Sequence, residues 1–270
     1  MGATHHAGPV TLSAGAASDV GTTRAHNEDS YLCEAPLFLV ADGMGGYAAG
    51  EVASAMVVDE FRPLAGAETV AVEQMREAFD RASARVDALA GETEGAGTTL
   101  TGVGLASVGG VGYWVVVNVG DSRTYRYDGA RLEQISVDHS VVQELIEAGE
   151  LTAQQARGDS RRNMVTRAIG AGAPGEPDFW MVPVETGDRV VVCSDGLSGE
   201  LEDEVIEATL ARVAGAQEAA DDLVRQALEA GARDNVTVIV VNAEHVGSSD
   251  EHAPGADTVP RADAPAEGAS

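Results

Sequence analysis

Apolar and polar residues alternate along the chain with two periods, one typical of strands and one typical of helices. Short apolar runs rich in β-branched residues predict strands at 37–40, 112–119, 189–193 and 236–241. Between residues 68 and 90, apolar residues recur every three or four positions, which predicts an amphipathic helix. The other expected elements are strands at 31–33, 98–106, 123–127, 131–136 and 179–182, and helices at 50–64, 141–147, 152–156, 203–213 and 217–229.

The order of these elements predicts the fold class and the domain organisation. Helices fall in pairs between groups of strands, which favours an α+β fold of packed antiparallel sheets with helices outside over a doubly wound parallel sheet. We expect a flexible leader at 1–12, because its residues are small and polar, and one domain at 13–245. An acidic tail rich in Ala and Pro, at 246–270, has no aromatic residue and is expected to be disordered.

The charge of the chain narrows the possible partners. Its 44 acidic residues outnumber 17 Lys and Arg, which gives a formal net charge of -27. Such a protein repels polyanions and anionic membrane surfaces, so we expect neither nucleic acid nor membrane as a partner. The two cysteines, Cys33 and Cys193, lie in apolar runs and are expected to be buried thiols. No stretch has the pattern of a signal peptide or a membrane-spanning helix, so the expected location is the cytoplasm.

Acidic residues stand at the boundaries of several predicted strands. Asp42 and Asp195 follow apolar runs, Asp121 closes another, and Asp234 precedes a strand of Val, Ile and Thr. An Asp-Gly pair alone is an ordinary turn, so Asp42-Gly43 is informative only as part of this set. Carboxylates that converge in space repel one another unless cations lie between them. Oxygen ligands favour Mg²⁺ or Mn²⁺, and Zn²⁺ is disfavoured because no His or Cys pair has ligand spacing.

These boundary residues belong to a longer series of motifs, and with them the sequence closely resembles the bacterial metal-dependent protein Ser/Thr phosphatases of type 2C. The resemblance runs from about residue 18 to residue 242. The motifs that carry it are Arg24 with Asn27-Glu28-Asp29, Asp42-Gly43-Met44-Gly45-Gly46, Gly97-Thr98-Thr99, Gly120-Asp121-Ser122-Arg123, Asp138-His139-Ser140, Arg167-Ala168-Ile169-Gly170, Ser194-Asp195-Gly196-Leu197-Ser198 and Asp234-Asn235-Val236-Thr237.

The resemblance implies a four-layer αββα sandwich, in which two antiparallel β-sheets are flanked by paired helices and a metal centre lies at one end. It implies that Asp42 bridges two tightly bound Mn²⁺ or Mg²⁺ ions, with the Gly43 carbonyl on one ion and Asp195 and Asp234 on the other. Asp121, together with Asp195, matches positions that hold a third, weaker ion; the alternative is that Asp121 only closes a hairpin.

The implied activity is hydrolysis of phosphoserine and phosphothreonine in proteins, by a metal-bridging hydroxide that attacks phosphorus in line. The resemblance assigns Arg24 to the phosphate oxygens, because a guanidinium can bind them through two donors, although a surface ion pair is the alternative for this residue. It assigns Glu28 to orienting metal-bound water, and Asp29 to a structural role in the same loop. The implied partners are phosphorylated proteins, among them Ser/Thr protein kinases and their substrates, and the expected state is a monomer.

Two parts of the family pattern are incomplete. Many relatives place a His after the first Asp-Gly or after the double Gly, where it assists protonation of the leaving group, but Met44 and Tyr47 stand there in this chain. His26 and metal-bound water are the alternatives for the general acid. The segment at about 139–163 matches a mobile flap, with Asp159-Ser160 where His-Pro is common. For Asp138-His139-Ser140, the interpretation favoured is the N-terminal cap of a helix.

Other functions were weighed against this one. A phospho-Asp phosphatase would require Asp-x-Asp-Gly, but residues 40 and 193 are Val and Cys. A P-loop would require Gly-Lys-Ser/Thr, but Glu51 follows Gly50. The remaining alternative is a binding or regulatory module on the same fold, in which metal chemistry is lost or restricted to a partner-switching phosphoprotein.

Overall fold

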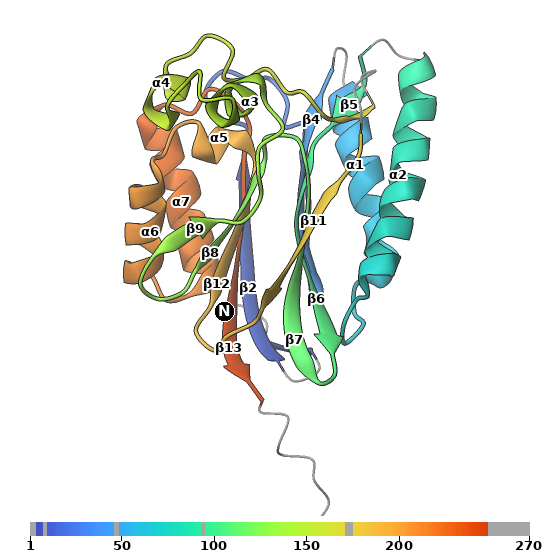
Figure 1. Cartoon of the computed structure of the whole chain (residues 1–270), viewed down its shortest axis with the longest axis vertical. Helices are drawn as coiled ribbons and strands as arrows, with labels where there is room; N and C mark the ends of the chain where they lie inside the picture. The colour runs from blue at the N-terminus through green and yellow to red at the C-terminus, as the bar shows by residue number, and fades with distance from the viewer. Residues whose placement is uncertain (1–3, 8–9, 46–48, 93–94, 171–174, 248–270) are drawn as a thin grey trace, which may run out of the picture.

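The computed structural model describes residues 4–7, 10–45, 49–92, 95–170 and 175–247, which form two antiparallel sheets packed face to face with helices on both outer sides (Figure 1). One sheet has six strands, in the order β1 (Thr4–Ala7), β2 (Val10–Asp19), β13 (Val236–Val246), β12 (Arg189–Cys193), β8 (Arg123–Tyr127) and β9 (Leu132–Gln134). The other has seven: β10 (Ile169–Gly170), β5 (Gly97–Thr98), β4 (Leu37–Met44), β6 (Leu100–Val108), β7 (Val111–Val119) and β11 (Asp178–Pro183), with β3 (Asp29–Glu34) paired to β4.

Each sheet is covered by one pair of helices. The seven-stranded sheet carries α1 (Ala49–Phe61) and α2 (Val72–Glu92), joined through the short 3₁₀ helix η1 (Arg62–Leu64). The six-stranded sheet carries α6 (Asp203–Arg212) and α7 (Ala216–Ala230). Three short helices lie at one end of the molecule: α3 (Val141–Glu147), α4 (Ala153–Arg157) and α5 (Asp195–Ser198) (Figure 1). The predicted α+β sandwich with four layers is therefore confirmed.

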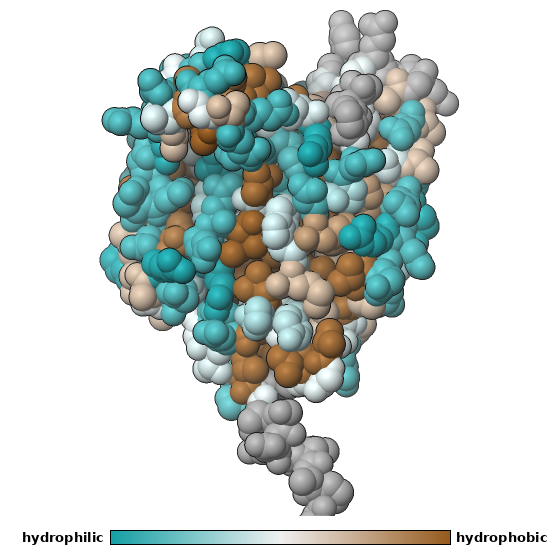
Figure 2. All heavy atoms as spheres, viewed as in Figure 1, coloured by the Kyte–Doolittle hydropathy of each residue, from teal (hydrophilic) through white to brown (hydrophobic). Residues whose placement is uncertain are grey.

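Three apolar cores hold the four layers together. One lies between the sheets and includes the fully buried Phe38 and Trp114. A second packs α1 and α2 against the seven-stranded sheet, and a third packs α6 and α7 against the other sheet. Strands such as β12 are buried along their whole length because both of their faces are covered, which explains their continuous Val-rich sequences. Figure 2 shows apolar residues at the surface mainly as a band where the two sheets meet, between polar helix surfaces.

The prediction of a loose leader at 1–12 is wrong for the described residues of that segment. Residues 4–7 form β1, and β2 begins at Val10, whose side chain is buried together with that of Leu12. The strand escaped prediction because most of its residues are small. A Cβ atom on Gly15 would lie 2.3 Å from the Cα of Gln217, so α7 requires a small residue there. The predicted tail lies outside the described residues from 248 onward, and β13 continues to Val246.

The strand pairing brings the acidic motifs to one end of the sandwich. Cys193, the last residue of β12, pairs with Val238 near the start of β13 and with Arg123 at the start of β8. Asp29 and Asp42 face each other across β3 and β4. Among the described residues, no helix is both long enough and apolar enough to span a membrane.

Candidate functional site

Four of the predicted metal ligands lie close enough to repel one another electrostatically. Burial and the charges of Asp29, Asp195, Asp121 and Asp234 raise the pKa of the Asp42 carboxyl well above its ordinary value. Burial is the larger cause, and the neighbouring carboxylates add to it. The sequence therefore predicted correctly that these distant acids meet in space.

The backbone of Asp42 is held by the two threonines of the neighbouring strand. Its N–H donates to Thr99 Oγ1 at 3.0 Å, and its carbonyl accepts from the Thr99 N–H and from Thr98 Oγ1, each at 2.9 Å. Thr99 Oγ1 also shares a hydrogen bond of 2.8 Å with Ser122 Oγ, beside Asp121. The Gly97-Thr98-Thr99 motif thus anchors two acidic segments, a role that sequence reasoning did not assign.

Asp195 and Asp29 are two further acids whose pKa values are raised. Burial and the charge of Asp234 raise the pKa of Asp195 to about 6, although a side-chain hydrogen bond with Asp42 opposes the change. Burial raises the pKa of Asp29 to about 7, against hydrogen bonds from Thr237 and Ser194 that lower it. One buried oxygen of each carboxyl, Oδ1, has no hydrogen-bond partner. Unpartnered buried carboxylate oxygens are suited to a cation.

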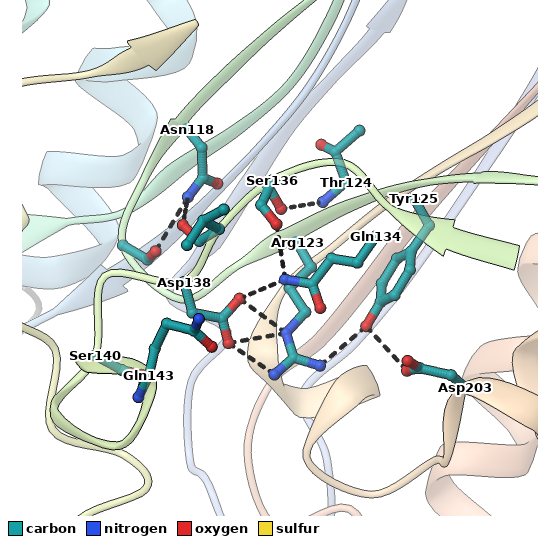
Figure 3. A network of polar contacts seen from close by, with 12 residues as sticks. Asn118, Arg123, Thr124, Tyr125, Gln134, Ser136, Asp138, Ser140, Gln143 and Asp203 are labelled. Atoms are coloured by element: carbon teal, nitrogen blue, oxygen red, sulfur yellow. Dashed lines mark hydrogen bonds and ion pairs between the residues drawn. The ribbon is translucent and has the colours of Figure 1, made fainter. Parts of the chain in front are cut away.

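Asp121 lies on the other side of Asp195, next to a buried ion pair. Its pKa is raised well above the ordinary value by burial first and then by the charges of Asp195 and Asp138. Arg123 donates to both oxygens of Asp138 at 2.7–2.9 Å and, through Nη1, to the Tyr125 hydroxyl at 3.0 Å (Figure 3).

The residues of the Asp138-His139-Ser140 motif have separate roles. Ser140 caps α3 by accepting from the Gln143 N–H, as predicted. Asp138 is instead the partner of Arg123, and His139 accepts from the Gly120 N–H at 3.2 Å. The N-cap interpretation is therefore correct only for Ser140.

Arg24 reaches the acids from the loop before β3. Its Nη2 lies 2.7 Å from Asp234 Oδ2, and the charges of Glu28 and Asp42 also act on it. About half of the Arg24 side chain, 52%, is exposed, so the guanidinium borders solvent. The ion pair weighed as the alternative for Arg24 is thus present, and its partner is one of the predicted metal ligands.

Close backbone contacts explain the glycine at position 43. A Cβ atom there would lie 2.3 Å from the Gly50 carbonyl oxygen and 2.6 Å from that of Glu28. The Gly43 N–H donates to the same Glu28 carbonyl at 3.2 Å, which ties the end of β4 to the Arg24 loop. The predicted Glu28 is half-buried and the predicted His26 is exposed. Gly46 and Tyr47, which complete the first motif, lie outside the described residues.

Asn235 is a site residue to which the sequence assigned no role. Its side chain holds the Arg24 loop, accepting from the Glu28 N–H at 2.8 Å and donating to the carbonyls of Val20 and His26. The only sequence feature that pointed to Asn235 was its position directly after Asp234. Its hydrogen-bond partners could not be predicted, because they lie more than 200 residues earlier in the chain.

The donor set suits hard divalent cations, because it consists of carboxylate and carbonyl oxygens. Within the described part of the chain, however, no three His, Cys, Asp or Glu side chains are already placed to hold one ion together. The Arg24–Asp234 ion pair engages one carboxylate oxygen of this expected ligand. The residues therefore fit the ions in chemistry, and Asp234 is the one ligand occupied by a competing cation.

A polar cavity of about 390 Å³ opens beside Asp121 and Asp195. Arg123 and Asp138 contribute to it, and residues of α3 and α4 form another side. The segment that contains α3 and α4 is closed at its base by a bridge between Ser140 and Val165. It corresponds to the predicted flap at 139–163 and adjoins the acidic cluster.

Comparisons with known proteins agree with this geometry. A family model described as Protein phosphatase 2C matches residues 22–231. The chain belongs to the protein phosphatase 2C family. It is 38% identical to the serine/threonine protein phosphatase PstP of Mycobacterium tuberculosis over 240 residues, which cover 86% of this chain and 45% of PstP. It is 35% identical to the serine/threonine phosphatase stp of Listeria welshimeri, over 83% of this chain and 93% of stp.

The same protein phosphatase 2C fold is found among solved structures. The crystal structure of the catalytic domain of PstP in complex with two manganese ions superposes with a TM-score of 0.78 and 36% sequence identity. The match covers 86% of this chain and 97% of that domain. The chain therefore spans a whole family domain, although it spans less than half of the full-length PstP.

Proposed function

We propose that this protein is a metal-dependent protein serine/threonine phosphatase, a phosphoric monoester hydrolase. The single observation that carries the proposal is the group of buried, mutually repelling carboxyls around Asp42, in a chain of the protein phosphatase 2C family. The two manganese ions of the related PstP domain support the same cofactor here, Mn²⁺ or Mg²⁺.

Asp42, Asp195, Asp234 and the Gly43 carbonyl would hold two ions, and Asp121 with Asp195 would hold a third, weaker one. Bound divalent cations would supply the positive charge that activates water and stabilises the oxygens of the phosphoryl group during displacement. Buried carboxylates favour this binding, because cations relieve the repulsion that now raises their pKa values.

Arg24 and Glu28 would act on the substrate side of the cluster. Arg24 is half exposed and its guanidinium can donate two parallel hydrogen bonds to phosphate oxygens. Glu28 is tied through its backbone to both Gly43 and Asn235, which supports the proposal that its carboxylate orients water by hydrogen bonding. The general acid would be His26 or water, and the exposed position of His26 leaves its ring accessible to a leaving group.

The expected substrates are phosphorylated proteins, including bacterial Ser/Thr protein kinases and the proteins that they phosphorylate, in cytoplasmic signalling. The proposed catalytic domain is residues 13–245, with 139–163 as a flap beside the cavity, and the proposed state is a monomer. The relatives that carry this proposal are themselves named serine/threonine phosphatases.

The test is release of inorganic phosphate from phosphoserine and phosphothreonine peptides. We expect release with Mn²⁺ or Mg²⁺ and none after EDTA, with Asp42→Asn as the matched inactive variant. If no Mn²⁺ concentration supports release, while the protein still binds a phosphorylated peptide, the chain is a binding module and the proposal is wrong.

A further inference from the structure

Asn235 joins the end of the acidic motif Asp234-Asn235 to the loop that carries Arg24. Both polar atoms of its side-chain amide are used, in three hydrogen bonds: Oδ1 accepts from the Glu28 N–H at 2.8 Å, and Nδ2 donates to Val20 O at 2.9 Å and to His26 O at 3.0 Å. Only 4% of Asn235 is exposed, so water does not compete for these bonds.

These bonds determine the shape of the loop. Because one NH₂ group binds the carbonyls of Val20 and His26, two points six residues apart are drawn together and Arg24 lies on the arc between them. The bond to Glu28 fixes the point where the loop enters β3. Asn235 thus contacts the loop on both sides of Arg24.

The backbone of Asn235 connects the same loop to α5. A Cβ atom on Gly196 would lie 2.0 Å from the Asn235 carbonyl oxygen, so the first turn of α5, which begins with Asp195, packs directly on it. Ser194 Oγ, next to Asp195, accepts from the N–H of Thr237 in β13 at 2.9 Å. One residue therefore lies between the Arg24 loop and the element that supplies Asp195.

We propose that Asn235 is a positioning residue, which holds the Arg24 loop over the acidic cluster so that Arg24 faces the phosphate. The proposal rests on the proposed phosphatase function. It assigns to Asn235 a role separate from metal binding, since its side chain faces backbone groups and not the carboxylates. No other side chain of the described residues bonds to Val20, His26 and Glu28 together.

The experiment is a double-mutant cycle of Asn235→Ala with Arg24→Ala, measured as kcat/KM for a phosphothreonine peptide with Mn²⁺. We expect Asn235→Ala to lower kcat/KM by about tenfold to a hundredfold in the wild-type background. In the Arg24→Ala background, the same change should cost less than about threefold, because the arginine that it positions is already gone. Fully additive losses would overturn the proposal.

Asn242→Ala is the matched control. Asn242 is a buried asparagine in β13, the strand that begins directly after Asn235. It bonds to Arg189 and to the Ala214 carbonyl, away from the cluster. We expect its removal to lower the melting temperature but to leave kcat/KM within about twofold of wild type. Asn235→Asp is the second variant, for use if Asn235→Ala folds poorly. It keeps the acceptor for the Glu28 N–H and loses both donated hydrogen bonds, so it should lower kcat/KM as Asn235→Ala does.

A second readout does not require catalysis. Amide hydrogen exchange of residues 21–28 should be at least about tenfold faster in Asn235→Ala than in wild type, and unchanged in Asn242→Ala. The Kd for Mn²⁺ measured by calorimetry should stay within about threefold of wild type. Unchanged exchange in the loop contradicts the positioning role, whereas a wild-type protein without any phosphatase activity contradicts only the proposed function.

Discussion

The Arg24 guanidinium lies 2.7 Å from the Asp234 carboxylate, which is one of the expected metal ligands. The pair lies at the surface of the site, with 52% of the arginine and 35% of the aspartate side chain exposed. A cationic side chain of the protein therefore engages a carboxylate that is proposed to bind a metal ion. Binding of metal should release Arg24 for the phosphate group.

The first prediction follows from this competition. Arg24→Ala should bind Mn²⁺ up to about fivefold more tightly than wild type, because a half-exposed ion pair contributes up to about 1 kcal/mol and no longer opposes the ion. Isothermal titration calorimetry measures the change. Arg85→Ala removes the same charge from an ion pair between Arg85 of α2 and Glu60 of α1, and should leave the Kd unchanged.

The second prediction concerns Asp42. Asp42→Asn should lower phosphate release about a thousandfold or more, because it removes the carboxylate proposed to bridge two ions. In EDTA the same variant should melt at a higher temperature than wild type, since the amide is neutral where the carboxylate is repelled by its neighbours. Addition of Mn²⁺ should then stabilise wild type more than the variant. A variant less stable than wild type in EDTA would contradict this account.

The third prediction is the pH dependence of the metal-free protein. Asp195 and Asp29 have pKa values of about 6 and about 7 in the folded state, against 3.8 for an ordinary Asp. Between about pH 4 and pH 7 the folded protein retains protons that the unfolded chain has released, so its free energy of unfolding should fall as pH rises. Between pH 5 and pH 8 the loss should be on the order of 4 kcal/mol. Urea titrations in EDTA at pH 5 and pH 8 measure it.

Saturating Mn²⁺ serves as the control for this pH dependence. Bound cations favour the ionised carboxylates and lower their pKa values, so the decline in stability toward pH 8 should disappear or reverse. An equal decline with and without metal would show that Asp195 does not hold a metal ion and that none binds close to Asp29.

The fourth prediction separates the buried ion pair in Figure 3 from an exposed one. Asp138→Asn should destabilise the protein by about 2–4 kcal/mol, because it leaves the largely buried Arg123 without its anionic partner. Arg161→Ala breaks an exposed pair with Asp159 in the flap and should leave the free energy of unfolding close to that of wild type, because solvent screens such a pair. Chemical denaturation with EDTA present compares the two. Equal losses of unfolding free energy in the two variants would contradict the prediction that the buried ion pair contributes more to stability than the exposed one.

The fifth prediction tests the backbone contact at Gly43. Gly43→Ala should destabilise the end of β4 by about 1–3 kcal/mol and weaken Mn²⁺ binding, because its Cβ would clash with the carbonyls of Gly50 and Glu28. Gly158→Ala is the control: its φ of -94° suits any residue, and its Cβ would meet nothing closer than 3.8 Å. A Gly43→Ala protein with wild-type stability and metal affinity would refute the close contact.

The sequence by itself determined the local elements and the chemistry of the donors. Periodicity placed the long helix at 68–90 close to α2 and the Val-rich strands close to β12 and β13, because local hydrophobic pattern decides which face of an element is buried. Carboxylates at strand ends were visible in the same way, since a strand boundary is a local feature.

Only the tertiary structure decided which distant segments meet and what each side chain then contacts. β2 was missed because its small residues are dictated by α7, not by a local hydrophobic signal. The roles of Asn235 and of the Arg24–Asp234 pair depend on contacts across more than 200 residues. Such contacts arise from sheet pairing and layer packing, which no local window of sequence contains.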